Sequence, residues 1–278
     1  MYTYNDLRKN VCSACRKGVE WGVIGRSSCG RNIIYFHLGP KKGKQIIIQG
    51  GIHAREWVTA LLVTAQVDFL RKEKFPIGVY FLPMTNPDGC DLCQLGAEAV
   101  GEYAQFVREI NGSDDFSLWK ANARGVDLNC NFDARFGKGK GNVTRPAPAS
   151  YIGAKKHSEA ETRALVDFTL RINPCMTVSY HALGREVYYE FFQTGDKLLR
   201  DRSIATRVSE YLGYRLVHGD LGSAGGYKDY CISALGIPAL TIEIIGEDKT
   251  HPLSNADLKG EENNLWIPLI LTNLLASL

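Results

Sequence analysis

The chain has 278 residues, of which 45% are hydrophobic and 23% are charged. These proportions are typical of a folded globular protein and exclude disorder over most of the chain. The formal charge of +3 comes from 33 basic and 30 acidic residues, and this balance excludes a strongly basic nucleic-acid-binding protein. A chain of this length can form one α/β domain, so we expect a single domain over residues 1–278.

The amino end and the cysteines indicate a cellular compartment. The first residues, MYTYNDLRKN, show no apolar stretch behind the basic residues, and no segment reaches the roughly 20 apolar residues that span a membrane. We therefore expect a cytoplasmic protein that binds neither membranes nor nucleic acids. Its eight cysteines are then expected to be reduced thiols. Two C-x-x-C pairs, Cys12 with Cys15 and Cys90 with Cys93, leave a four-thiolate zinc site as an alternative.

Strand and helix patterns alternate along the chain. Runs of β-branched and aromatic residues between turn formers predict strands over residues 32–38, 45–49, 78–83, 176–180, 186–191 and 239–245. Helical spacing of apolar residues predicts helices over residues 55–72, 158–171, 197–212 and 262–278. Ser158 and Glu161 have the spacing of a capping box at the start of the second helix. The alternation predicts an α/β fold with a mixed, largely parallel sheet between helices.

One long segment lacks any such pattern. Residues 132–154 (FDARFGKGKGNVTRPAPASYIGA) are rich in glycine, proline and basic residues and show little periodicity. They predict a long surface loop, and long loops on an α/β scaffold often line the functional site. We find no internal repeat and no linker that would divide the chain.

A metal-ligand pattern follows the second predicted strand. The segment IIIQGGIHAREWVT places His53 and Glu56 three residues apart at the start of a helix. Zinc accepts both imidazole and carboxylate ligands, although such a pair also occurs in structural roles. His181 ends another apolar strand, and a parallel neighbour would bring it to the same edge of the sheet. We therefore expect one Zn²⁺ per chain, bound by these three residues, with water in an open fourth position.

Several motifs occur in one order along most of the chain. They are GGIHAREW, TNPDG, NARGVDLNCNF, SYH and ALTIEI. With these motifs the sequence resembles the zinc carboxypeptidase family, the carboxypeptidase A-like metallopeptidases. The resemblance implies an eight-stranded mixed sheet with helices on both faces, and a zinc peptidase that cleaves an amide bond with metal-activated water.

The resemblance also implies roles for individual residues. His53, Glu56 and His181 would be the zinc ligands. Glu243 matches the family's general base, which takes a proton from the zinc-bound water and returns it to the leaving amine. Arg124 matches the arginine that polarises the scissile carbonyl.

Three other matches concern the surroundings of the reacting atoms. Arg55 and Asn129 match residues at the polar end of the substrate. Residues 86–89 look like a turn that packs under the site and carries no chemistry.

Three positions depart from the classical members of the family. Cys130 stands where those members have an arginine that binds a free C-terminal carboxylate, and a neutral thiol cannot make such charge-assisted bonds. Leu221 stands at the position of a mobile tyrosine. Lys228 stands at the position that sets side-chain preference, where it would attract a negative group. A Lys228 that is solvated or paired with Asp229 is an equally good interpretation.

These departures resemble the bacterial branch that cleaves the γ-D-glutamyl–diaminopimelate bond of murein peptides. Diaminopimelate ends in a carboxylate and an amine, which Lys228 with Asp229 or Tyr230 could bind. We therefore expect a murein-derived peptide as substrate. One alternative is a conventional carboxypeptidase that uses Arg55, Asn129 or Arg135 as its anchor, and another is a zinc-binding relative without catalysis. The sequence leaves the oligomeric state open.

Overall fold

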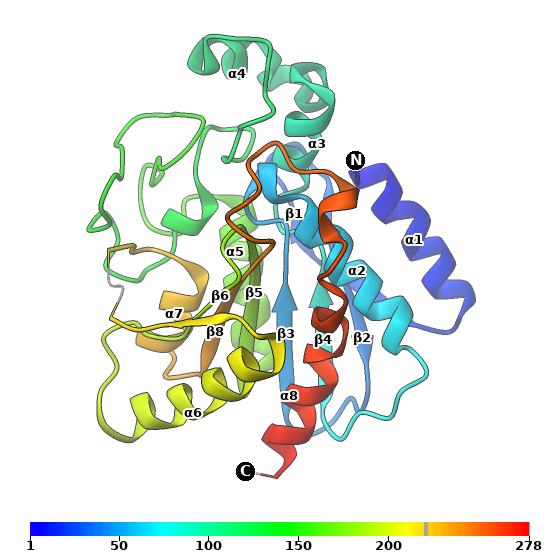
Figure 1. Ribbon diagram of the computed structural model, residues 1–278. Coiled ribbons are helices and arrows are strands. Elements are labelled where there is room, and N and C mark those ends of the chain that lie inside the picture. Colours follow the sequence, from blue (N-terminus) through cyan, green and yellow to red (C-terminus); the bar gives the residue numbers. More distant parts are fainter. Residues whose placement is uncertain (220–221, 278) are drawn as a thin grey trace.

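Eight strands form one mixed sheet in the computed structural model, which describes residues 1–219 and 222–277 (Figure 1). The strands are β1 (Glu20–Arg26), β2 (Asn32–Leu38), β3 (Gln45–Gln49), β4 (Gly78–Leu82), β5 (Met176–Ala182), β6 (Glu186–Tyr188), β7 (Arg215–Val217) and β8 (Ala239–Ile244). Their order in the sheet is β1-β2-β4-β3-β5-β8-β6-β7. The central strands β4, β3, β5 and β8 run parallel, whereas β1, β2 and β6 form antiparallel pairs. The predicted α/β fold is confirmed.

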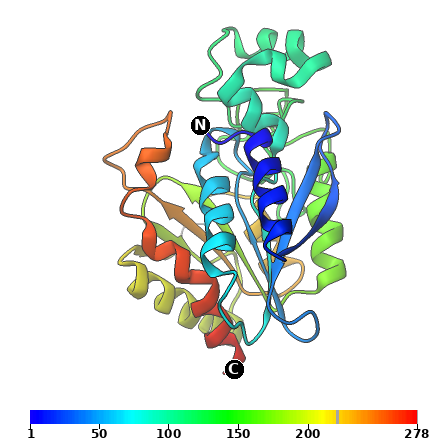
Figure 2. The ribbon, with the colours of Figure 1, turned by 90° about the vertical axis from the view of Figure 1, so that its right-hand side faces the viewer.

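Helices cover both faces of this sheet. They are α1 (Tyr4–Arg16), α2 (Val58–Leu70), α3 (Pro87–Leu95), α4 (Ala104–Asn111), α5 (Ala160–Ile172), α6 (Gly195–Leu212), α7 (Tyr227–Ser233) and α8 (Ile267–Ala276). Ile46 and Ile48 of β3 pack into a cluster with residues of α1, α2, α6 and α8, whereas Ile47 packs with α5 and α7. Figure 2 shows α5 across the sheet from α2 and α8. Apolar residues on both faces explain why β3 has no polar face.

The sequence does not predict the two edge strands, β1 and β7. Trp21 and Val23 of β1 are exposed, so this strand lacks the apolar run that marks the central ones. Strand β7 has three residues, which is too short to give a pattern. The helix predicted over 55–72 is divided, because a 3₁₀ turn (Ala54–Glu56) precedes α2. The last helix is likewise preceded by a 3₁₀ turn (Glu262–Trp266), and residue 278 lies outside the described residues.

The predicted capping box of α5 is wrong. Glu159 is the N-cap, and it makes no side-chain cap hydrogen bond. Ser158 donates its hydroxyl to Glu159 Oε1 at 2.7 Å, and the Glu161 carboxylate accepts from the Ser28 N–H at 3.0 Å. The polar side chains expected to cap the helix are therefore bound to other groups.

Two further expectations concern membranes and thiols. Within residues 1–219 and 222–277, no helix is both long enough and apolar enough to cross a membrane. All eight cysteines are free of disulfides, and those of α1 are exposed whereas Cys90 of α3 is buried. In this part of the chain no cluster of thiols is arranged to hold a metal, so the four-thiolate alternative is not formed.

Candidate metal centre and active site

A glycine pair turns the chain from β3 towards His53. Gly51 has a φ of +58°, and a Cβ at this position would lie 3.2 Å from Met84 Cα. A residue with a side chain would therefore be strained and crowded there. His53 follows this turn, and the short 3₁₀ turn Ala54–Glu56 places Glu56 beside it. Local backbone geometry thus aims both side chains at one point.

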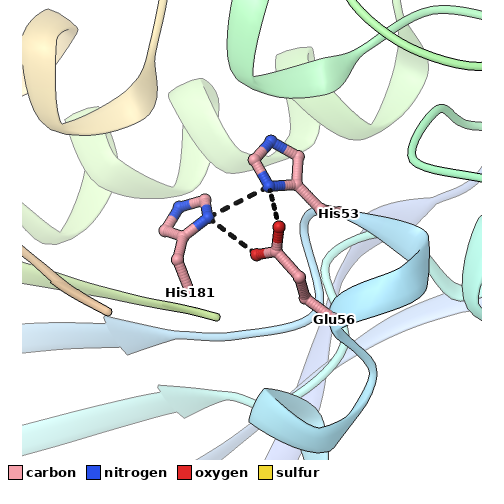
Figure 3. Close-up of side chains that lie close together, drawn as sticks. All are labelled: His53, Glu56 and His181. Atoms are coloured by element: carbon pink, nitrogen blue, oxygen red, sulfur yellow. Dashed lines mark hydrogen bonds and ion pairs between the residues drawn. The ribbon is translucent and has the colours of Figure 1, made fainter. Parts of the chain in front are cut away.

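The third member of the group comes from the neighbouring parallel strand. Gln49, the last residue of β3, pairs with Ser179 of β5, so His181 lies just beyond the carboxyl end of β3. His53 Nδ1 lies 2.9 Å from Glu56 Oε1, and His181 Nδ1 lies 3.0 Å from Glu56 Oε2 (Figure 3). The two Nδ1 atoms are 3.1 Å apart. All three side chains are buried.

This triangle of ligand atoms fits a zinc ion. Zinc binds imidazole nitrogen and carboxylate oxygen at about 2.0–2.2 Å, which sets tetrahedral ligands about 3.3 Å apart. Burial alone would raise the pKa of Glu56, but the two adjacent imidazoles hold it well below its usual value. Glu56 is therefore a carboxylate, the form that binds a metal. Two histidines and one glutamate form a donor set of catalytic zinc sites.

A buried ion pair that the sequence analysis missed lies behind His53. Asp127 Oδ1 is 3.3 Å from His53 Nε2, and Asp127 Oδ2 is 3.1 Å from Lys120 Nζ. Burial opposes the charge of Asp127, but Lys120 and His53 hold its pKa below the usual range. Metal-binding histidines are commonly oriented by a carboxylate on their other nitrogen. Asp127 lies within the NARGVDLNCNF motif, which is the one sequence signal for it.

A pocket of about 260 Å³ opens beside the three candidate ligands. It is lined by His53, Lys120, Asn129, His181, Tyr188, Ser223, Gly226, Lys228, Asp229, Thr241 and Glu243. Of the eight residues predicted to act in catalysis or substrate binding, four line this pocket: Asn129, Lys228, Asp229 and Glu243. The other lining residues besides the candidate ligands, Lys120, Tyr188, Ser223, Gly226 and Thr241, were not predicted.

Strand register places Glu243 beside the three candidate metal ligands. Glu243 of β8 is the direct partner of His181 in the parallel β5–β8 pair. Thr241 precedes it by two residues and so shares its face of the strand. Burial raises the pKa of Glu243 to about 7, with nearby His181 favouring the charged form and Glu56 opposing it. A carboxylate with such a pKa can accept and return a proton near neutral pH.

Lys228 and Asp229 form an ion pair at the start of α7. Lys228 Nζ lies 2.7 Å from Asp229 Oδ1 and donates to the Glu190 carbonyl at 2.8 Å. Asp229 Oδ2 accepts from the Gly226 N–H at 3.3 Å. The pairing that the sequence analysis left open is thus present, and both side chains still line the pocket.

The structure does not bring Arg124 or Tyr230 to the pocket. Arg124 is half exposed, and its Nε lies 3.8 Å from Glu159 Oε2. The Tyr230 ring packs edge-on against His157, with their centroids 5.4 Å apart. Lys120, another cation, does line the pocket with His53 and Glu243.

Arg55 and Cys130 do not line the pocket either. Arg55 lies between His53 and Glu56, and its buried Nε has no hydrogen-bond partner among the described residues. The Cys130 carbonyl packs so closely on Gly225 that a Cβ there would lie 2.6 Å away. Leu221 falls outside the described residues. Residues 86–89 begin α3, and Asn86 donates to the carbonyls of Ile52 and Ala121 at 3.2 and 3.1 Å.

Fold and site together define a class of protein. A mixed sheet carries two histidines and a glutamate at the carboxyl edge of its parallel strands, with a partly buried glutamate on the neighbouring strand β8 beside them. This arrangement is that of a metal-dependent hydrolase of the α/β class.

Comparison with known proteins is consistent with that class. The sequence model that describes the zinc carboxypeptidase family (Peptidase_M14) matches residues 4–266 of this chain. The chain therefore belongs to the zinc carboxypeptidase family, and it is a zinc metallopeptidase. A curated relative, "Gamma-D-glutamyl-L-diamino acid endopeptidase 1" of Lysinibacillus sphaericus, is 28% identical over 93% of this chain and 68% of its own length.

Solved structures share the fold. The crystal structure of thrombin activatable fibrinolysis inhibitor superposes with a TM-score of 0.81 and 20% identity, over 99% of this chain and 77% of that chain. Murein-tripeptide amidase MpaA from Escherichia coli O157 gives a TM-score of 0.59 and 22% identity, over 91% of each chain.

Proposed function

We propose that the chain hydrolyses the γ-D-glutamyl–diaminopimelate bond of murein-derived peptides. The observation that carries this proposal is the Lys228–Asp229 pair, which places a cation and a carboxylate together on the wall of the pocket that holds Glu243. A residue that ends in a carboxylate and an amine is complementary to such a pair. Cys130, in place of a carboxylate-binding arginine, removes the anchor by which a conventional carboxypeptidase binds an ordinary C-terminal carboxylate. The name of the Lysinibacillus relative supports the same bond.

We assign the metal-binding role to His53, Glu56 and His181. Zinc held there lowers the pKa of bound water to about 7 and polarises a carbonyl. Glu243 accepts the proton of the attacking water and then donates it to the leaving amine, so that the amide C–N bond breaks and an acid and an amine are released. No residue of the chain forms a covalent bond with the substrate in this scheme.

Lys120 is assigned the role expected of Arg124, that of stabilising the oxyanion. Although burial opposes its charge, Asp127 and Glu56 raise the pKa of Lys120, so it stays a cation. Lys120→Met is expected to lower kcat/KM about 100-fold, whereas Lys120→Arg retains most of the activity. Because Lys120 also holds Asp127, zinc affinity is measured in both variants. A loss of activity explained entirely by zinc loss would contradict the assignment.

Lys228 is expected to determine which peptide is cleaved. Wild-type protein should prefer diaminopimelate to lysine in otherwise identical peptides, since lysine lacks the far carboxylate. Lys228→Met should raise KM about 10-fold for the diaminopimelate peptide and leave KM for the lysine peptide unchanged. The ratio of kcat/KM for the diaminopimelate peptide to kcat/KM for the lysine peptide should therefore fall about 10-fold. Thermal unfolding checks that the variant, which leaves Asp229 unpaired, is folded. Equal cleavage of both peptides by the wild type would contradict this role.

The proposal as a whole is tested by mass spectrometry of products. The zinc-loaded protein is incubated with L-Ala-γ-D-Glu-diaminopimelate and with blocked dipeptides that end in a free carboxylate, and Glu243→Gln serves as the blank. We expect L-Ala-D-Glu and diaminopimelate as products. Faster release of C-terminal residues from the dipeptides would instead support a conventional carboxypeptidase. Stoichiometric zinc without hydrolysis of any peptide would support a non-catalytic relative.

The cellular setting stays a prediction of the sequence. A cytoplasmic location fits the handling of murein fragments inside the cell, and fractionation with an antibody against the chain tests it. Recovery of the protein outside the cytoplasm would contradict it.

A further inference from the structure

The loop over residues 132–154 carries an excess of positive charge. It contains Asp133 and four basic residues, which are Arg135, Lys138, Lys140 and Arg145. Its formal charge therefore equals the +3 of the whole chain, so the remaining residues together are neutral. The net positive charge of the chain thus equals that of this one irregular segment.

Hydrogen bonds fix this loop beside the active-site pocket and behind His53. On one side the Lys140 N–H donates to the Gly222 carbonyl at 2.9 Å, and the Gly225 N–H donates to the Ala134 carbonyl at 2.8 Å. These glycines flank Ser223, which lines the pocket. On the other side the Ser150 N–H donates to Asp127 Oδ2 at 3.2 Å, behind His53. The stretch around Lys140 therefore lies beside Ser223, at the rim of the pocket.

In residues 1–219 and 222–277, no carboxylate forms an ion pair with the cations of the loop. The one carboxylate of the loop, Asp133, pairs at 2.6 Å with Lys156, which lies outside it. Lys138, Lys140 and Arg145 are exposed, and the ion pairs found among the described residues do not include them. The Arg135 guanidinium stacks on Phe192, 4.1 Å from the ring centroid. Among the described residues, Lys138, Lys140 and Arg145 thus have no carboxylate partner.

We propose that this cationic rim binds carboxylates in the part of the substrate that extends beyond the pocket, so that acidic peptides are the preferred substrate class. This inference rests on the proposed peptidase function. Exposed charges act over about 10 Å at moderate ionic strength, so the rim should increase affinity without contacting the reacting atoms. Its effect should appear in KM and in salt dependence, whereas kcat should stay nearly constant.

The test compares a rim variant with a matched control. The rim variant combines Lys138→Gln, Lys140→Gln and Arg145→Gln. The control combines Lys42→Gln, Lys72→Gln and Lys74→Gln, which removes the same charge from exposed positions at the opposite end of the parallel strands. Both variants replace exposed side chains, and thermal unfolding confirms that they are folded.

The peptides share one γ-D-glutamyl–diaminopimelate bond and are extended at either end by three glutamates or three alanines. At low ionic strength, the zinc-loaded rim variant should show a KM for the glutamate peptides raised about 5- to 10-fold. The alanine peptides and the control variant should be unaffected. Equal KM values for both extensions in the wild type, or an equal loss in the control variant, would overturn the inference.

Binding to zinc-loaded protein carrying Glu243→Gln separates this inference from the proposed function. Its Kd for each peptide is measured with and without the rim substitutions. In one outcome, the wild type hydrolyses none of the peptides, the Kd still favours glutamate extensions, and the rim substitutions abolish that preference. This result would support the binding role of the rim and overturn the proposed function. Hydrolysis of the shared bond without any Kd preference would overturn the rim alone.

Discussion

Replacing Glu243 by glutamine is expected to lower kcat about 1,000-fold while zinc content stays at one per chain. Glutamine keeps the size of the side chain but cannot accept a proton from water or return it to the amine. Glu243 is the strand partner of His181 but is not in the group formed by His53, Glu56 and His181, so the substitution should leave metal binding intact. Steady-state kinetics and zinc analysis of the same sample give the result. Retention of most of the activity would rule out Glu243 as the base.

The loss of wild-type activity at acid pH should also come from Glu243. Burial raises the pKa of Glu243 to about 7, and protonation removes its ability to act as a base. Activity should therefore be present above this pKa and should fall as the pH is lowered through it. A cation bound nearby favours the carboxylate, so this loss should occur at or below about pH 7 in the zinc-loaded protein. A kcat/KM that increases as the pH decreases from 7 to 5 would contradict this pH dependence.

Replacing His181 by alanine is expected to weaken zinc binding at least about 100-fold and to abolish hydrolysis at ordinary zinc concentrations. The variant removes one corner of the ligand triangle, because His181 Nδ1 lies 3.0 Å from Glu56 Oε2 and 3.1 Å from His53 Nδ1. Zinc that binds the folded state stabilises it by mass action. Added zinc should therefore raise the unfolding temperature of the wild type and have little effect on the variant.

His218→Ala is the matched control for that experiment. His218 packs against Tyr189 and Glu190, and it is not a member of the metal group. This control should keep both its zinc and its activity. Full zinc occupancy in His181→Ala, or equal loss of zinc from both variants, would contradict the assignment of His181.

The parts of the site that follow apolar strands could be predicted from the sequence. Strand β3 is fully buried around three consecutive isoleucines and is followed by a glycine pair, and this pattern places His53 and Glu56 at the sheet edge. His181 could be found because β5 is also fully buried. Parallel strands bring their carboxyl ends to one edge, so short local patterns sufficed to bring together residues far apart in the chain.

Residues whose position depends on turns could not be predicted in this way. Arg124 precedes Gly125, which has a φ of +68°, in a turn where the Gly125 N–H donates to the Asn122 carbonyl at 3.1 Å. This turn leaves Arg124 half exposed, whereas Lys120, just before it, faces Asp127 inside the protein. Both are cations near the same motif, and composition alone does not distinguish them.

Cross-strand register was the other missing information. Tyr188 lines the pocket because it pairs with Thr241 in the antiparallel β6–β8 pair. The sequence predicts a longer strand over residues 186–191 and does not show that it runs antiparallel to β8. The face that Tyr188 presents therefore becomes known only from the assembled sheet.

The most direct test of the metal centre is an anomalous difference map, recorded at the zinc edge from crystals of the zinc-loaded protein. We predict one strong peak per chain, about 2.0–2.2 Å from His53 Nδ1, His181 Nδ1 and the Glu56 carboxylate. A zinc peak elsewhere in the chain, with none between these three side chains, would contradict the account.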